Sequence, residues 1–550
     1  MTRLGPRQYA ALAAFALAIY LPGRASLPPL DRDEARYMQA TAQMLQTGNF
    51  VDVRFQNQPR YLQPAGIYWL EAAAVAATGT LHQRAAWAWR IPSLLAAVTS
   101  LLLTASIGAA LFGPEAGLFA ALLLSVSVLM TAEARMATID SCLLTTVLLV
   151  EWALLRALRD RAQEVAAPAW TAALYWGGLG VGLMLKGPVI LIPGFGTPLA
   201  LALLERNARW FGRLRPAWGV PLMLAIVLPW MIAIGVVSHG SFFSNAVGVN
   251  FLGKIASGQQ AHGLPPGYHT LVFALAFWPS SFFAAAALPF VWLRRRQPEV
   301  RFLLCWIVPV WLVFELIATK LPHYVLPAYP AIAILAAAAL TAPDGWTLPH
   351  STIGRVLLLL YGLLWLLVGL AIVVAGPILL WRLQHMVSLP ALLAAIGGIA
   401  LVAAAAWLAL VLREPRRALG FVAAGALVTY ASLFWVVLPN LRMIWLSPRI
   451  AAMVDAVKPC ADSRLASASF SEPSLVFLVG GNTDLVNAPG AADLLARDPR
   501  CALALVGTRD EAAFRARLAH DHIAARPLGH LQGINYSTGK RLSLTLYGAR

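Results

Sequence analysis

Charged residues are scarce in this sequence. They make up 12% of its 550 residues, while hydrophobic residues make up 59%. An ordinary soluble domain carries about 25% charged residues, so this composition excludes a chain that is soluble along its whole length. The sequence also lacks a P-loop, a dinucleotide-binding fingerprint, internal repeats and low-complexity tracts. The usual signatures of nucleotide-binding and repeat proteins are therefore missing.

Long apolar runs take up most of the chain instead. A hydrocarbon core about 30 Å thick needs about 20 apolar residues per helix. Thirteen runs of about this length lie near residues 8–27, 87–112, 115–134, 137–157, 169–185, 187–205, 217–237, 270–293, 301–319, 324–341, 353–380, 389–412 and 418–438. The first run could instead be a cleaved signal peptide, since Arg3 and Arg7 precede an apolar stretch. We therefore expect an α-helical polytopic membrane protein with about 13 transmembrane helices.

Basic residues gather in alternate connections between these runs. With the N-terminus in the cytoplasm, the positive-inside rule is obeyed at every cluster. The clusters are Arg156, Arg159 and Arg161; Arg206, Arg209, Arg213 and Arg215; Arg294, Arg295, Arg296 and Arg301; Arg355; and Arg413, Arg416 and Arg417. This placement accounts for the formal net charge of +17 without a nucleic-acid partner. We expect a bacterial inner-membrane protein with a periplasmic C-terminus, a first periplasmic loop at 28–86 and a long loop at 238–269.

The sequence changes character after the last apolar run. Its apolar segments shorten to strand length and alternate with helix-like stretches such as Ala491–Arg497 and Glu511–His520. We expect a transmembrane domain over 1–440 and a periplasmic soluble α/β domain over 441–550. Cys460 and Cys501 both fall in the second domain. They could form a disulfide in an oxidising compartment, or remain separate buried apolar side chains.

Ionisable residues cluster in the connections predicted to face outward. Asp33 and Glu34 begin an amphipathic helix predicted over 33–47, where a capping role alone would explain them. Further charged, amide and aromatic residues follow: Arg36, Tyr37, Arg60, Gln63, Tyr68, Glu133, Arg135, Asp140, Lys186, Lys320, His323 and Tyr324. Any one of them could simply reach the membrane surface. Together they predict a site where cations hold a phosphate-bearing lipid and a carboxylate acts as base or orients the nucleophile.

Several motifs occur in the order found in one group of enzymes. They are Asp-Glu-Ala-Arg-Tyr at 33–37, Ala-Arg-Met-Ala-Thr-Ile-Asp at 134–140, Leu-Lys-Gly-Pro at 185–188 and Lys-Leu-Pro-His-Tyr at 320–324. In these motifs the chain resembles bacterial aminoarabinose transferases and related protein-mannosyltransferase-like enzymes. The resemblance implies the C-type glycosyltransferase fold and a donor sugar carried on undecaprenyl phosphate. It also implies a lipid acceptor such as lipid A or another lipopolysaccharide.

The same resemblance assigns roles to individual residues. Asp33, with Glu34 beside it, takes the place of the key loop carboxylate, and Asp140 takes the second acidic position. Lys186, Tyr324 and Lys320 would line the donor phosphate pocket, and we expect Lys254 to contact the phosphate as well. The remaining residues expected at the substrate site are Arg36, Tyr37, Gln63, Tyr68, Arg135, His262 and His323.

The chain departs from that group at several positions. It reads Leu62-Gln63-Pro64 where aminoarabinose transferases usually read Glu-Lys-Pro, and it has Asn250 and Lys254 where they have Glu and Arg. Lys254 keeps the charge but loses bidentate geometry. We hypothesise that Arg60 supplies the missing cation. Since the usual Glu is absent, we expect no metal and no other cofactor.

The expected reaction inverts the anomeric centre, with Asp33 as general base if the acceptor is a hydroxyl. A pentose, a hexose or a uronic acid would all suit the donor. Protein O-mannosylation is an alternative within the same enzyme class. A lipid or sugar transporter is an alternative of another class, although transporters usually place charges near the midplane and show repeated halves. A third reading is an assembly scaffold that works through its C-terminal domain.

Overall fold

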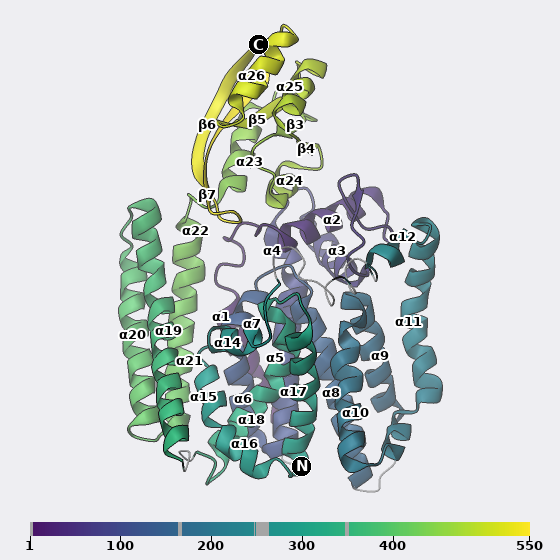
Figure 1. Ribbon diagram of the computed structural model, residues 1–550, viewed down its shortest axis with the longest axis vertical. Helices are drawn as coiled ribbons and strands as arrows, with labels where there is room; N and C mark the ends of the chain where they lie inside the picture. Colours follow the sequence, from purple (N-terminus) through teal and green to yellow (C-terminus); the bar gives the residue numbers. More distant parts are fainter. Residues whose placement is uncertain are drawn as a thin grey trace.

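The computed structural model describes residues 4–162, 168–246, 248, 253, 263–346 and 351–549. The helices run roughly side by side, with the N-terminus at one end and the C-terminal domain at the other (Figure 1). We call the end with the C-terminal domain the outer end and the other the inner end. Asn250, Lys254 and His262 lie outside the described residues.

Every predicted apolar run coincides with helical structure. The long helices are α1 (Pro6–Tyr20), α5 (Ile91–Phe112), α6 (Pro114–Ser125), α8 (Asp140–Ala162), α9 (Ala169–Lys186), α10 (Leu191–Glu205), α11 (Pro216–Val237), α17 (Pro298–Leu316), α18 (Tyr329–Thr341), α19 (Thr352–Gln384), α20 (Leu389–Leu410) and α21 (Pro415–Ala431). Eight stretches of the described chain are long and apolar enough to cross a membrane, and one of them, Ala169–Glu205, contains both α9 and α10. A multi-pass membrane protein is therefore confirmed, while the count of thirteen spans stays a prediction.

One predicted span is broken into three helices. The run at 270–293 becomes α14 (Tyr268–Ala276), α15 (Ser281–Ala286) and α16 (Leu288–Arg294). Pro279 lies between α14 and α15, where its lack of an N–H and the clash of its ring with the preceding turn disfavour a continuous helix. The run at 115–134 is likewise divided between α6 and α7 (Val128–Glu133).

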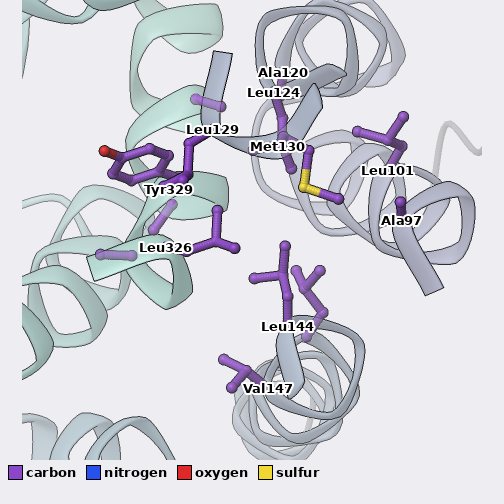
Figure 2. Packing of buried hydrophobic residues seen from close by; sticks show 14 of the residues in the cluster. Ala97, Leu101, Ala120, Leu124, Leu129, Met130, Leu144, Val147, Leu326 and Tyr329 are labelled. Atoms are coloured by element: carbon purple, nitrogen blue, oxygen red, sulfur yellow. The ribbon is translucent and has the colours of Figure 1, made fainter. Parts of the chain in front are cut away.

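The core lies where α5, α6, α7, α8 and α18 meet. Figure 2 shows Leu101, Leu124, Met130, Leu144 and Tyr329 converging from these five helices, and all five residues are buried. The short helix η4 (Pro322–Ala328) leads into α18 at the outer end of this core. The packing therefore fixes the outer ends of α8 and η4 relative to each other.

The first outer segment folds into two helices on the outer end of the bundle. These are α2 (Asp33–Thr47) and α3 (Gly66–Thr78), and strands β1 (Arg54–Phe55) and β2 (Gln58–Pro59) form a small hairpin between them. The helix α2 coincides with the amphipathic helix predicted over 33–47. Gly66 lies so close to α9 that a Cβ there would be 2.5 Å from the Met184 carbonyl oxygen. This contact sets Gln63 and Pro64 beside the outer end of α9.

The C-terminal domain is the predicted α/β structure. Its five-stranded sheet has the order β4-β3-β5-β7-β6, with β4, β3 and β5 parallel and β7 and β6 antiparallel. The strands are β3 (Leu465–Ser467), β4 (Thr483–Leu485), β5 (Leu503–Gly507), β6 (Ala525–Asn535) and β7 (Lys540–Ala549). The helices are α23 (Leu446–Val457), α24 (Pro473–Val479), α25 (Ala488–Arg497) and α26 (Glu511–His520).

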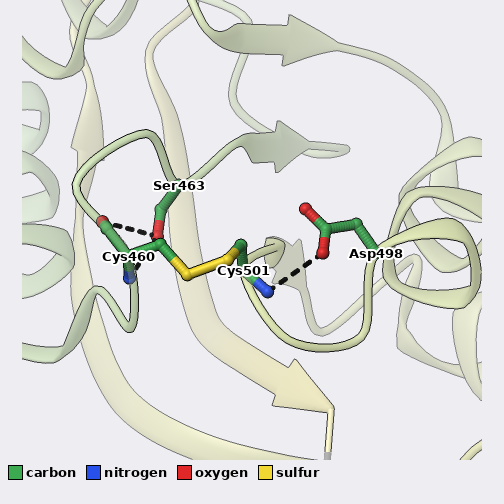
Figure 3. Close-up of a disulfide and its surroundings, with 4 residues drawn as sticks. All are labelled: Cys460, Ser463, Asp498 and Cys501. Carbon is green, nitrogen blue, oxygen red and sulfur yellow. Dashed lines mark hydrogen bonds between the residues drawn. A yellow bond between two sulfur atoms is a disulfide. The ribbon is translucent and has the colours of Figure 1, made fainter.

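Cys460 and Cys501 form a disulfide in this domain (Figure 3). Of the two alternatives left open by the sequence, pairing is the one present. The bridge joins the chain after α23 to the turn that precedes β5, across 41 residues. Cys142 and Cys305 are free and buried among the transmembrane helices.

Candidate functional site

A cavity of about 520 Å³ opens near the outer end of the bundle. Most of its wall is apolar and comes from α9, α11, α17 and η4. Five polar side chains also line it, namely Gln63, Asp140, Lys186, His323 and Tyr324. Such a site suits a ligand that has a long apolar part and one small polar or charged group.

An ion pair lies at the polar part of the cavity. Asp140 begins α8 and Lys186 ends α9, so the neighbouring helices bring the two residues together at the outer end. Lys186 Nζ donates a hydrogen bond of 2.5 Å to Asp140 Oδ1. The same Nζ lies 5.7 Å from the ring centroid of Tyr324. The predicted association of these three residues is present in the structure.

A second carboxylate and a histidine adjoin this pair. His323 Nδ1 lies 3.9 Å from Glu133 Oε1, and His323 Nε2 lies 4.0 Å from Asp140 Oδ2. Thr138 Oγ1 donates a hydrogen bond of 2.7 Å to Glu133 Oε2. Ligand-type atoms of Glu133, Asp140 and His323 all lie within 4.8 Å of one another, so among the residues that the structure describes these three could hold a metal ion.

The sequence pattern places Glu133 among the outward-facing ionisable residues without assigning it a role of its own. Glu133 ends α7, and Asp140 begins α8, so the six residues 134–139 form the turn between the two carboxylates at the outer end. The signal in the sequence is that both acids flank the same turn between two apolar runs.

The first outer segment contributes a cluster of aromatic and polar side chains. Gln63 Nε2 donates a hydrogen bond of 2.5 Å to Tyr37 Oη, and Arg60 Nε donates one of 2.9 Å to Tyr68 Oη. The Arg60 guanidinium lies 5.1 Å from the centroid of the Tyr37 ring. Burial and the neighbouring Arg60 lower the pKa of Arg36. Two guanidinium groups therefore lie close together on this side of the cavity mouth.

Asp33 is exposed at the first position of α2. Its charge interacts with those of Arg36 and Arg60. Burial and the charge of Asp33 raise the pKa of Tyr37 well above its usual value. Asp33 also interacts electrostatically with Glu133 and Tyr324. It is thus a solvent-accessible carboxylate whose charge acts on Tyr324, a residue that lines the cavity.

Glu34 has a different environment from Asp33. It is 2% exposed, and its carboxylate accepts hydrogen bonds of 2.8 and 3.0 Å from Arg90. The backbone N–H groups of Leu30 and Ala137 donate two more. We expected a catalytic role for Glu34, but these four bonds favour a structural one, in which it joins α2 to the start of α5 and to the turn before α8.

Two basic side chains of the predicted site donate their hydrogen bonds to backbone carbonyls instead. Lys320 is buried, and its Nζ donates hydrogen bonds to the carbonyls of Phe314, Glu315 and Ile317 at the end of α17. This geometry favours helix capping over the expected phosphate contact.

Arg135 is likewise buried and bonded to backbone. It donates a hydrogen bond of 3.0 Å to the Pro22 carbonyl and one of 2.6 Å to the Thr131 carbonyl, and it also bonds the Ile19 carbonyl. Its guanidinium lies 3.9 Å from the centroid of the Phe434 ring. The expected substrate contact of Arg135 is therefore not favoured. Lys254 and His262 lie outside the described residues, so their roles stay predictions.

Part of the chain matches a family model. Residues 63–232 match the family described as dolichyl-phosphate-mannose-protein mannosyltransferase. This match covers Gln63, Tyr68, Asp140 and Lys186 among the residues discussed above.

Curated relatives are similar over a longer part of the chain. The undecaprenyl phosphate-alpha-4-amino-4-deoxy-L-arabinose arabinosyl transferase of Pseudomonas paraeruginosa is 28% identical over 311 residues, which is 56% of this chain and 55% of that protein. An enzyme of the same name from Pseudomonas fluorescens is 30% identical over 320 residues, again 56% of this chain and 55% of the relative. The chain thus spans about half the length of the curated relatives it matches.

A solved structure is similar over nearly the whole chain. The crystal structure of ArnT from Cupriavidus metallidurans bound to undecaprenyl phosphate has a TM-score of 0.74 with 18% identity. The match covers 98% of this chain and 97% of that one. The resemblance to aminoarabinose transferases and protein-mannosyltransferase-like enzymes is therefore confirmed, and the chain has the C-type glycosyltransferase fold that we expected.

Proposed function

We propose that this protein is an integral-membrane glycosyltransferase that moves a sugar from an undecaprenyl phosphate donor to a lipid or lipopolysaccharide acceptor at the outer end of the bundle. Lipid A is the acceptor we favour. In this proposal the protein lies in a bacterial inner membrane, with its N-terminus cytoplasmic and its C-terminal domain periplasmic. The names of the curated relatives support the donor class.

One observation carries the proposal. The cavity joins a long apolar wall to the polar group of Lys186, Tyr324 and Gln63. A polyprenyl chain fits the apolar wall, and its phosphate would reach Lys186 and the Tyr324 hydroxyl. Charge-assisted hydrogen bonds of this type stabilise a phosphate that gains negative charge as it leaves.

The reaction can be written from these positions. The bond between the anomeric carbon and the phosphate oxygen breaks, and its electron pair stays on the polyprenyl phosphate. The acceptor oxygen attacks from the opposite face, so the anomeric centre inverts. When the acceptor is a hydroxyl, Asp33 takes its proton. When the acceptor is a phosphate, no proton is transferred, and Asp33 balances Arg36 and Arg60.

We further propose that the reaction needs no metal ion. Lys186 Nζ lies 2.5 Å from Asp140 and supplies the positive charge that a divalent cation would otherwise bring to this carboxylate. Glu133, Asp140 and His323 would be the ligands if a cation were used. A Lewis acid there would polarise the leaving phosphate, which is the role we give to Lys186.

Protein O-mannosylation is a second candidate. It is favoured by the family match over residues 63–232. Transport is less consistent with the structure, because the polar groups of the cavity lie at the outer ends of α8, α9 and η4 and not at the midplane.

The decisive experiment compares envelope lipids, glycans and proteins by mass spectrometry in three strains. One strain carries the intact gene, one lacks it, and one carries Asp33→Ala. We expect one sugar-modified lipid to be lost in both altered strains. A missing glycoprotein would favour O-mannosylation, and unchanged profiles in both altered strains would contradict the transferase.

A further inference from the structure

A second cavity, of about 640 Å³, lies at the inner end of the bundle. Its wall includes Tyr9 of α1, Ser106 and Ala110 of α5, and Arg156 and Arg159 of α8. Asp140 and Arg159 are 19 residues apart on α8, which corresponds to about 29 Å along a helix. This cavity is therefore separate from the one that we assign to the donor, and no step of the proposed transfer uses it.

Two arginines on successive turns of α8 give this cavity its charge. The Arg156 guanidinium lies 4.7 Å from the ring centroid of Trp170 and 6.0 Å from that of Trp152, so aromatic rings hold it in place. Within the described ranges, neither Arg156 nor Arg159 makes an ion pair, and the Arg156 Nε is buried without a hydrogen-bond partner. Arg159 interacts electrostatically with Glu299.

The other wall of the cavity is neutral. Tyr9 Oη and Ser106 Oγ share a hydrogen bond of 2.8 Å, and the residues around them, such as Leu4 and Ala110, are small or apolar. A ligand that fills this space needs an anionic group for the arginines, acceptor oxygens for the hydroxyls, and an apolar body.

We propose that this cavity binds the phosphate headgroup of an anionic phospholipid from the leaflet at the inner end of the bundle. Guanidinium groups recognise phosphate through paired hydrogen bonds. Basic pockets between transmembrane helices on the side of the positive loops are suited to anionic lipid headgroups. The two arginines would hold the phosphate, and the glycerol and upper acyl chains would lie on the apolar wall.

Native mass spectrometry of the full-length purified protein tests this proposal, with phosphatidylglycerol as the probe. We expect Arg156→Gln with Arg159→Gln to weaken lipid retention roughly 30-fold, since each arginine near the surface contributes about fivefold. The matched control is Arg295→Gln with Arg296→Gln, which removes two exposed arginines near the end of α16 and should leave retention unchanged. A third variant, Ala110→Phe, fills the cavity while keeping both arginines and should also displace the lipid.

The same measurements can overturn the proposal. Equal retention in the two double variants would show that only overall charge matters. Displacement of the lipid signal by millimolar inorganic phosphate, with phosphate itself retained, would assign the site to a free anion. If the protein with Arg156→Gln and Arg159→Gln does not fold, the Ala110→Phe variant alone tests the proposal. Undiminished retention in a folded Ala110→Phe protein would contradict the proposal.

Discussion

Lys186 and Asp140 form an ion pair of 2.5 Å between the outer ends of α9 and α8, on the wall of the apolar cavity. The two residues are 46 positions apart in the sequence. Their contact places one cation beside a space large enough for part of a lipid. The proposed chemistry depends more on this pair than on any other contact in the structure.

Replacing Lys186 by alanine should abolish most of the transferase activity. The lysine is the cation that we assign to the leaving phosphate, and loss of one such donor costs about 100-fold or more in kcat. The measurement is turnover of a synthetic undecaprenyl phosphate sugar by purified protein. Lys458→Ala is the control, because Lys458 pairs with Asp455 on the C-terminal domain, far along the chain from the cavity. Equal turnover in both variants would remove Lys186 from the mechanism.

Asp33 and Glu34 should behave differently although they are adjacent. Asp33→Asn should reduce kcat and leave the melting temperature unchanged, since Asp33 is exposed. Glu34→Gln should instead destabilise the protein by about 3 kcal/mol, because it leaves the buried Arg90 without its charged partner. Turnover and thermal unfolding of both variants check this. A stable Glu34→Gln protein without activity would restore the catalytic role that the sequence suggested.

The contact between the first outer segment and the C-terminal domain should weaken as pH rises. Asp31 Oδ1 accepts a hydrogen bond from the Ser474 N–H, and the Asp31 N–H donates one to Tyr536 Oη. Burial, together with the charge of Glu472, raises the pKa of Asp31 from 3.8 to about 6. The Asp31 carboxyl therefore holds its proton more tightly when the first outer segment contacts the C-terminal domain. The stability of this contact is greatest below about pH 4 and falls until the pH passes about 6.

Hydrogen exchange in α24 measures this docking as a function of pH. Protection should decrease between about pH 4 and about pH 6, and Asp31→Asn should remove most of the dependence. Asp455→Asn serves as the control, because that carboxylate is exposed. A pH dependence that persists in Asp31→Asn would assign the titration to another group.

Reduction of the Cys460–Cys501 bridge should destabilise the C-terminal domain. Closing a loop of 41 residues restricts the unfolded chain and is worth about 4 kcal/mol. Calorimetry with and without reductant, and of a protein with both residues changed to serine, should show the same decrease. Reductant should have no effect on the serine variant. An effect there would point to some other target of the reductant.

Chelators should leave transfer unaffected if Lys186 replaces a metal ion. Dialysis against EDTA, followed by a turnover assay, checks this expectation directly. Loss of activity that zinc or magnesium restores would contradict it. The ligands would then be Glu133, Asp140 and His323, and His323→Ala should raise the metal concentration needed for recovery.

The sequence predicted the helices well because the thickness of a membrane sets the length of each apolar run. Interruptions of a helix within a run were harder to predict. The predicted span at 270–293 contains Pro279 and divides into three helices, since apolar composition says nothing about backbone continuity.

The structure brings some of the predicted site residues together at the cavity and places others elsewhere. Asp140, Lys186 and Tyr324 meet at the cavity as expected. Lys320 and Arg135 occupy similar outer turns, yet they bind backbone carbonyls. One sequence cannot separate these cases, because the choice between a cavity and a helix end depends on the rotation of each helix in the bundle.

Gly66 ties α3 to α9, and Asp31 ties the segment before α2 to the C-terminal domain. The first outer segment is therefore an adaptor with one face fitted to the membrane bundle and the other to the soluble domain. A chimera built from two relatives would keep this arrangement only if the segment that contains α2 came from the same protein as the C-terminal domain. A hybrid that takes residues 441–550 alone would combine two surfaces that were never matched to each other.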